Sequence, residues 1–126
     1  MTKKQYQPAV AALHDAHSIC IVTHLRPDAD AIGSAAALLL ALRQRGKNVC
    51  AVVGQEREIS RNLYTIPAAD DVTTSRELPE GYDLYVTVDC GSLDRTGFFA
   101  DRIEQLAQQG RVLCICLLYT SDAADE

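Results

Sequence analysis

The sequence lacks several features that would assign it to particular classes of protein. It has no apolar run of the roughly 20 residues that a membrane-spanning helix needs. The N-terminal segment 1–7, Met-Thr-Lys-Lys-Gln-Tyr-Gln, has no apolar core of the kind found in secretory signal peptides. Internal repeats and low-complexity stretches are also missing. These absences predict a cytoplasmic protein with no membrane partner.

An excess of basic residues is absent too. The chain has 12 Lys and Arg against 17 Asp and Glu, which gives a formal net charge of −5. This balance offers no extended basic surface, so we do not expect duplex DNA as a partner. Hydrophobic residues make up 48% of the 126 residues, a composition that predicts one globular domain with a modest core.

The cysteines form no Cys-x-x-Cys pair. Most of them lie in apolar, strand-like runs, so we expect small buried hydrophobic side chains in a reducing compartment rather than disulfides. Cys90 directly follows Asp89, and we also expect it to have a packing role. The five positions are Cys20, Cys50, Cys90, Cys114 and Cys116.

The apolar patterning predicts an α/β fold, an open parallel sheet with helices on both faces. Val10, Leu13 and Ala16 have helical spacing, and Ile32, Leu38, Leu39, Leu40 and Leu42 are expected to form the apolar face of a longer helix. The expected strands are 18–23, 48–53, 72–74, 84–88 and 112–115, and the expected helices are 5–16, 30–44, 57–64 and 99–109.

The most informative segment is the strand-to-helix loop within residues 22–34, which contains His24, Asp28 and Asp30. Ligands of open α/β sheets bind at the carboxyl ends of strands. One imidazole and two carboxylates there suit a borderline-hard divalent metal such as Mn²⁺. Each of these residues also has an explanation that needs no metal. A histidine can be structural, and an aspartate at the start of a helix can cap that helix, which applies above all to Asp30. Gly33 allows either close approach of a phosphate to the helix N-terminus or packing of the helix on the strand.

Two stretches resemble a known family. The pattern His-x-x-Pro-Asp-x-Asp-x-x-Gly-Ser at positions 24–34 resembles the first motif of the DHH phosphoesterases, most closely that of the nanoRNase and pAp-phosphatase branch. The RecJ-type exonucleases are more distant relatives. Val-Thr-Val-Asp-Cys-Gly-Ser at 86–92 resembles the second motif, an aspartate at the end of a strand.

The resemblance implies a two-metal hydrolase whose ions are Mn²⁺ or, as an alternative, Mg²⁺. His24 and Asp28 would hold one ion, Asp30 the other, and Asp89 would bridge both. Asp28, Asp30 and Asp89 are thus the expected catalytic residues. Arg26, Ser34 and Arg95 are weaker candidates for contacts with the substrate phosphate. The implied substrates are short oligoribonucleotides and 3′-phosphoadenosine 5′-phosphate.

The third motif of this family, Asp-His-His, is absent from the sequence. Residues 116–126, Cys-Leu-Leu-Tyr-Thr-Ser-Asp-Ala-Ala-Asp-Glu, resemble one reading frame of a transposon-based sequencing adapter. We therefore predict that residues 1–115 are a truncated N-terminal catalytic domain and that 116–126 are a non-native tail. On this interpretation the 126-residue chain is inactive and holds metal weakly.

Two alternatives stay open. The chain could be a non-catalytic nucleotide-binding α/β module that uses residues 28–34 as an anion site, although paired carboxylates repel phosphate without a cation. It could also be an inorganic pyrophosphatase of the same superfamily.

Overall fold

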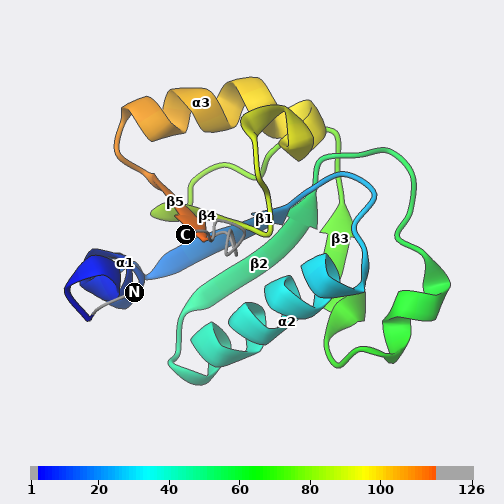
Figure 1. Ribbon diagram of the computed structural model, residues 1–126, viewed down its shortest axis with the longest axis horizontal. Coiled ribbons are helices and arrows are strands. Elements are labelled where there is room, and N and C mark those ends of the chain that lie inside the picture. Colours follow the sequence, from blue (N-terminus) through cyan, green and yellow to red (C-terminus); the bar gives the residue numbers. More distant parts are fainter. Residues whose placement is uncertain (1–2, 116–126) are drawn as a thin grey trace, which may run out of the picture.

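Five short strands form one parallel sheet in the computed structural model, which describes residues 3–115 (Figure 1). Their order across the sheet is β3-β2-β1-β4-β5, and each pair of neighbours is parallel. The predicted fold class is confirmed, and all five predicted strands are present. Their bounds are Ser18–Thr23 (β1), Asn48–Val53 (β2), Val72–Thr74 (β3), Leu84–Val88 (β4) and Val112–Ile115 (β5).

Helices cover both faces of this sheet. In Figure 1, α2 lies below the sheet and α3 above it. Apolar residues of α1 and α2 join one core cluster, and those of α3 join the other. The α-helices are Lys3–Asp15 (α1), Ala29–Gln44 (α2) and Ala100–Gln108 (α3), and the 3₁₀ helices are Arg61–Thr65 (η1), Ala69–Asp71 (η2) and Leu93–Phe99 (η3).

The two cores follow from the alternation of side chains along the strands. In β1, Ile19 and Ile21 face the α1 and α2 layer, whereas Cys20 and Val22 face the α3 layer. All four are fully buried. A strand that is apolar on both faces is typical of the centre of a parallel sheet, which is where β1 lies.

The expected apolar face of α2 was partly wrong. Ile32, Leu39 and Leu42 are buried, but Leu38 is only half-buried and Leu40 is 39% exposed. Residues in a helix are about 100° apart, so three consecutive leucines cannot share one face. Alanines fill the rest of the buried face instead and allow the helix to lie close to the sheet: Ala31, Ala35 and Ala36.

Other expectations also needed correction. Val10 of α1 is 54% exposed, and the helix expected over 57–64 is only the short η1 at Arg61–Thr65. Among the described cysteines Cys20 is buried, but Cys50 is half-buried and Cys114 is exposed, so the expectation of buried thiols holds for Cys20 only. Cys116 and the expected tail 116–126 lie outside the described residues. No helix within residues 3–115 is long and apolar enough to cross a membrane.

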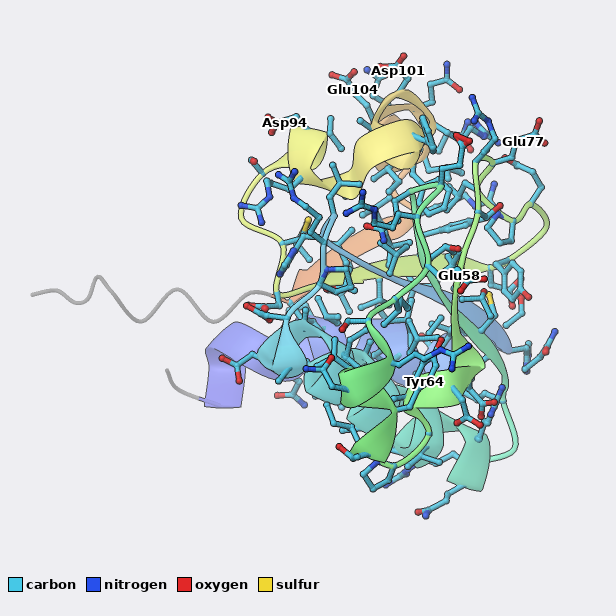
Figure 2. All side chains as sticks on the ribbon, turned by 90° about the vertical axis from the view of Figure 1, so that its right-hand side faces the viewer. Glu58, Tyr64, Glu77, Asp94, Asp101 and Glu104 are labelled. Carbon is cyan, nitrogen blue, oxygen red and sulfur yellow. The ribbon has the colours of Figure 1, made fainter. Side chains whose placement is uncertain are left out.

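The outer surface of η3 and α3 carries acidic side chains beside two arginines, Arg95 and Arg102. Asp94, Asp101 and Glu104 are exposed and point away from the sheet in Figure 2. This layer therefore does not present a continuous basic surface.

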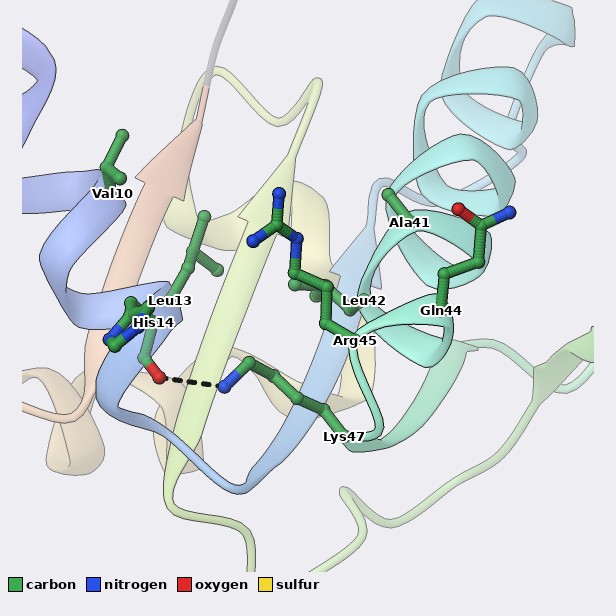
Figure 3. A pocket seen from close by; sticks show the side chains of 8 residues that line it. All are labelled: Val10, Leu13, His14, Ala41, Leu42, Gln44, Arg45 and Lys47. Atoms are coloured by element: carbon green, nitrogen blue, oxygen red, sulfur yellow. Dashed lines mark hydrogen bonds between the residues drawn. The ribbon is translucent and has the colours of Figure 1, made fainter.

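A groove of about 820 Å³ lies between the carboxyl ends of α1 and α2 (Figure 3). The Lys47 ammonium closes its base by donating to the carbonyls of His14 (2.8 Å) and Ala16 (2.6 Å). Because α1 and α2 end just before β1 and β2 begin, this groove lies at the amino-terminal edge of the sheet.

Candidate metal centre

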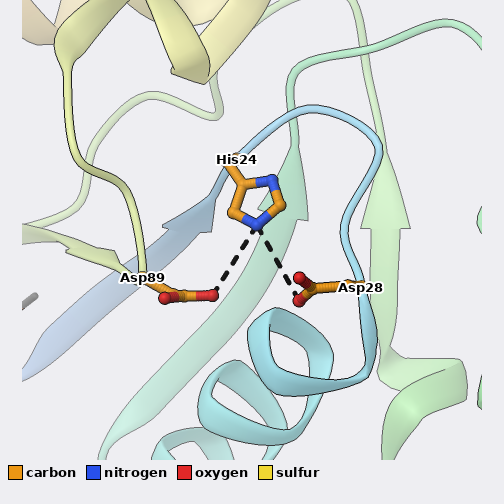
Figure 4. A group of neighbouring side chains, drawn as sticks. All are labelled: His24, Asp28 and Asp89. Atoms are coloured by element: carbon orange, nitrogen blue, oxygen red, sulfur yellow. Dashed lines mark ion pairs between the residues drawn. The ribbon is translucent and has the colours of Figure 1, made fainter. Parts of the chain in front are cut away.

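Three of the predicted ligands meet at the carboxyl-terminal edge of the sheet. His24 directly follows β1, and Asp89 directly follows β4, while Asp28 precedes α2. Their ligand atoms all lie within 4.8 Å of one another (Figure 4). The chain passes from β1 to β2 on one side and returns to β4 on the other, so the cluster lies at the point where the strand order reverses. Ligands of open α/β sheets bind at such points.

The His24 ring is oriented toward the two carboxylates. Its Nε2 lies 3.6 Å from Asp89 Oδ2 and 3.9 Å from Asp28 Oδ1. Its Nδ1 lies 2.7 Å from the carbonyl oxygen of Leu25. A carbonyl can only accept, so we assign the ring proton to Nδ1, which leaves the lone pair on Nε2. A histidine that donates its other N–H to a backbone carbonyl is the usual arrangement of a metal ligand.

Asp28 has a second role as the N-cap of α2. Its backbone is extended, and its Oδ1 accepts a hydrogen bond of 2.9 Å from the Ala31 N–H. Capping by Asp30 was the alternative raised from the sequence, and it is wrong because α2 begins at Ala29, one residue earlier than expected. The cap fixes the Asp28 carboxylate beside His24 before any ligand binds.

Asp89 is held in a backbone conformation that few non-glycine residues adopt. Its φ is +53°, and its N–H donates to the Ile115 carbonyl at 3.1 Å. Arg26, two residues after His24, has a φ of +49°. Left-handed backbone at non-glycine residues costs about 1–3 kcal/mol and gathers at functional sites. Of the three such residues in the described chain, Asp89 belongs to the cluster, Arg26 closely follows His24 in sequence, and Ala68 precedes η2.

The donor set fits a divalent cation. A lone pair on Nε2 and two carboxylates would repel one another at these distances unless a proton or a metal ion lay between them. His24 is only 7% exposed, so water screens this repulsion poorly on the imidazole side. One imidazole and two carboxylates suit Mn²⁺, Mg²⁺ and related ions better than metals that prefer thiolates.

Asp30, the fourth predicted ligand, is not part of this cluster. It lies in the first turn of α2 and is exposed. Ser34 lies one turn further along the helix and is half-buried. Between them, a Cβ added to Gly33 would meet nothing within 4 Å. The alternative that Gly33 is needed for packing against the strand is therefore wrong, and the space beside this first turn is open.

The two predicted phosphate-binding arginines lie on loops around the cluster. Arg95, in η3, is exposed and places Nη2 3.3 Å from Nδ1 of His24. Since Nδ1 already donates to Leu25, this approach is a packing contact, and the guanidinium keeps its donors for other partners. Arg26 is exposed, and its N–H donates to Gln55 Oε1 at 2.7 Å.

The residues that join η3 to the loops beside the cluster could not be recognised from the sequence. Gly97 has a φ of +67°, and a Cβ there would lie 2.3 Å from the Gly54 carbonyl oxygen. The Phe98 N–H donates to that same oxygen at 3.0 Å, and the Leu25 N–H donates to the Arg95 carbonyl at 2.8 Å. These contacts join η3 to the loops after β1 and β2. A pair of distant glycines in direct contact cannot be recognised without the fold.

Comparisons with known proteins agree with this fold. Residues 18–116 match the family model described as "DHH family, N-terminal domain". The chain is also similar to the crystal structure of an exopolyphosphatase-related protein from Bacteroides fragilis, with 25% sequence identity and a TM-score of 0.70. That match covers 94% of this chain and 37% of the Bacteroides protein, so the chain spans little more than a third of that relative. The chain therefore belongs to the DHH family of phosphoesterases, through the N-terminal domain of that family.

Proposed function

We propose that this domain contributes the metal centre of a phosphoesterase that hydrolyses short oligoribonucleotides and 3′-phosphoadenosine 5′-phosphate. The observation that carries the proposal is the convergence of His24, Asp28 and Asp89 on one position at the carboxyl edge of the sheet. The lack of a basic excess supports a short substrate, because a short nucleotide bound through a metal needs no extended basic surface.

His24, Asp28 and Asp89 would hold one divalent ion, with Mn²⁺ the preferred one, and Asp30 with Asp89 would contribute to a second. Such ions supply an activated water and neutralise charge on the phosphate in the transition state. Around them, the chain's own residues orient the substrate. The exposed guanidiniums of Arg26 and Arg95 attract the phosphate, and the open space beside Gly33 lets a phosphate oxygen approach the first turn of α2.

A second candidate substrate class is inorganic polyphosphate or pyrophosphate. The similarity to a protein described as exopolyphosphatase-related favours it. The metal centre serves either substrate equally, because both present a phosphoryl group with a charged leaving oxygen. The two classes differ in whether the substrate carries a base.

Metal binding is the first test. Mn²⁺ binding to the 126-residue chain is followed by calorimetry and by electron paramagnetic resonance. Since we expect this chain to hold metal weakly, His24→Ala and Asp89→Asn should each abolish measurable Mn²⁺ binding, because even loss of outer support for a ligand costs about 10–100-fold. Asp94→Asn is the matched control, because Asp94 is exposed and its carboxylate accepts from Ser92 Oγ. Equal affinity in the His24 and control variants would refute the metal centre.

Hydrolysis is the second test. Two proteins are assayed: the 126-residue chain and the protein that its genomic locus encodes naturally, which we call the locus product. Each is given a dinucleotide, 3′-phosphoadenosine 5′-phosphate or pyrophosphate, with Mn²⁺ or with chelator. We expect Mn²⁺-dependent release of mononucleotide by the locus product and none by the 126-residue chain. Turnover of pyrophosphate alone would favour the second candidate. Nucleotide binding that survives chelation, with no turnover of any substrate, would favour a non-catalytic binding module.

A further inference from the structure

A second hollow opens beside the metal centre, on the other side of the loop that follows β1. Its volume is about 490 Å³, and its lining is mostly apolar. Leu25, Gly54, Gln55, Gly97 and Phe98 contribute to it. Leu25 connects it to the cluster, since its side chain lines the cavity while its carbonyl accepts from His24 Nδ1. One residue thus separates the cavity from a metal-ligand candidate.

Two glycines, Gly54 and Gly97, line the cavity and bring no side chain into it. They lie where two segments pack closely, since a Cβ on Gly54 would lie 2.5 Å from the Thr96 oxygen and a Cβ on Gly97 would lie 2.3 Å from the Gly54 oxygen. At these two positions the cavity offers only peptide backbone, against which a flat ligand can lie.

The wall is an exposed aromatic ring. Phe98 is 48% exposed although it lies between residues that are packed tightly. The Arg76 guanidinium lies 4.9 Å from the ring centroid and is itself paired with Glu56. Arg76 does not line the cavity, so it supports the ring from outside. An apolar ring held in place beside an apolar hollow is a stacking platform.

Gln55 connects the two loops of the rim. Its Oε1 accepts from the Arg26 N–H, and its Nε2 donates to the Arg57 carbonyl at 2.6 Å. Three charged residues also line the cavity, Arg26, Arg57 and Glu56, and the Glu56 carboxylate is paired with Arg76. The two guanidiniums therefore give the rim a positive balance, which favours a ligand that carries an anion.

We propose that this cavity binds the base of the nucleotide whose phosphate lies at the metal centre, by stacking on Phe98. This inference rests on the proposed nucleotide substrate. Because stacking uses the π-face that every base has, the cavity discriminates little between bases. The cavity also favours binding of a nucleotide over pyrophosphate, because pyrophosphate has no ring to place in it.

The absence of tryptophan from the 126-residue chain allows a direct test. Phe98→Trp introduces the single indole, and its emission is followed while AMP, CMP or ribose 5-phosphate is added with Mn²⁺. We expect both nucleotides to quench the emission to similar extents and ribose 5-phosphate to leave it unchanged. Tyr64→Trp is the matched control, since Tyr64 is a comparably exposed aromatic residue, 46% against 48%, in η1 and outside this cavity.

Absence of quenching by AMP in Phe98→Trp would overturn the inference, as would equal quenching in Tyr64→Trp or by ribose 5-phosphate. A second variant tests catalysis in the locus product. Phe98→Ala should lower kcat/KM for a dinucleotide by roughly 5- to 150-fold, the range for loss of one base stack.

These outcomes separate the two proposals. If the dinucleotide is hydrolysed and Phe98→Ala changes nothing, the base site is wrong and the phosphoesterase function stands. If no substrate is hydrolysed but AMP and CMP both quench Phe98→Trp, the base site stands and the catalytic proposal fails.

Discussion

The Thr23 hydroxyl donates a hydrogen bond of 2.9 Å to the Val88 carbonyl, between two buried residues at the ends of neighbouring strands. Thr23 immediately precedes His24, and Val88 immediately precedes Asp89. This bond therefore fixes the distance between the two strand ends that carry the imidazole and the carboxylate. It supports the metal centre although neither residue touches it.

Thr23→Val should destabilise the fold by about 1 kcal/mol, because the shape is kept while the hydrogen bond is lost. It should also weaken Mn²⁺ binding about 10-fold or more, as loss of outer support does at other metal sites. Thermal unfolding and calorimetric titration measure the two effects. Thr23→Ser keeps the hydroxyl and should bind Mn²⁺ like the wild type. If the valine variant loses stability but keeps full affinity, Thr23 has only a structural role.

Gly33→Ala should stabilise the fold and impair function. Alanine is favoured over glycine inside a helix by about 0.5–1 kcal/mol, and the added Cβ would meet no atom of the protein within 4 Å. If a phosphate oxygen approaches α2 at this position, the methyl group would obstruct it. We expect a higher Tm and weaker binding of AMP in the presence of Mn²⁺. A more stable variant with unchanged AMP affinity would remove Gly33 from the phosphate site.

The strands and the loop between 22 and 34 could be predicted because their signals are local. An apolar run such as Ser18–Thr23 identifies a buried strand, and the order of His24, Asp28 and Asp30 resembles a family motif. The strand order was not predicted, and it is this order that places Asp89 beside His24. The neighbouring cavity was missed as well, since the contact between Gly54 and Gly97 joins residues far apart in the chain.

Gly97→Ala should be strongly destabilising. The residue has a φ of +67° and a ψ of −126°, a combination that L-residues with a side chain rarely adopt, and its Cβ would lie 2.3 Å from both the Gly54 oxygen and Leu25 Cδ2. We expect a loss of at least about 2 kcal/mol in denaturant unfolding. Gly91→Ala, in the same connection between β4 and α3, is the matched control, because its Cβ would meet nothing within 4 Å. Similar stability of both variants would contradict the close contact.

Asp83 should make stability depend on pH in acid. Its Oδ2 accepts from the backbone N–H groups of His17 (2.9 Å) and Ser18 (3.2 Å), and these bonds, His17 first, hold the pKa of the Asp83 carboxyl below its usual value. A lowered pKa in the folded state contributes stability above the unfolded pKa of about 4, and this contribution is lost as the pH falls through the folded pKa.

Asp83→Asn should therefore be less stable than the wild type at pH 7, and the difference should shrink below about pH 4. Urea unfolding at several pH values measures it. Asp101→Asn, at another exposed aspartate, is the control. A constant difference between Asp83→Asn and the wild type across this range would show that the charge of Asp83 is irrelevant.

Cys50 should react faster with alkylating agents at neutral pH than Cys20, the thiol that faces it. It lies directly opposite Cys20 in the pairing of β1 with β2. The Cys20 thiol and, to a smaller extent, the Tyr82 hydroxyl donate to its sulfur and lower the pKa of Cys50 to about 7, against the opposing effect of burial. The same interaction raises the pKa of Cys20, which stays protonated as the donor.

Alkylation of Cys50 by iodoacetamide, followed by mass spectrometry of the modified peptide, should reach half its maximal rate near pH 7. Cys20→Ala removes the main donor and should move this midpoint toward the ordinary thiol value of about 8.5. Tyr82→Phe should move it in the same direction by less, since its hydrogen bond is the smaller cause. An unchanged midpoint in Cys20→Ala would mean that the two facing cysteines do not share a proton, and that Cys50 behaves as an isolated, half-buried thiol.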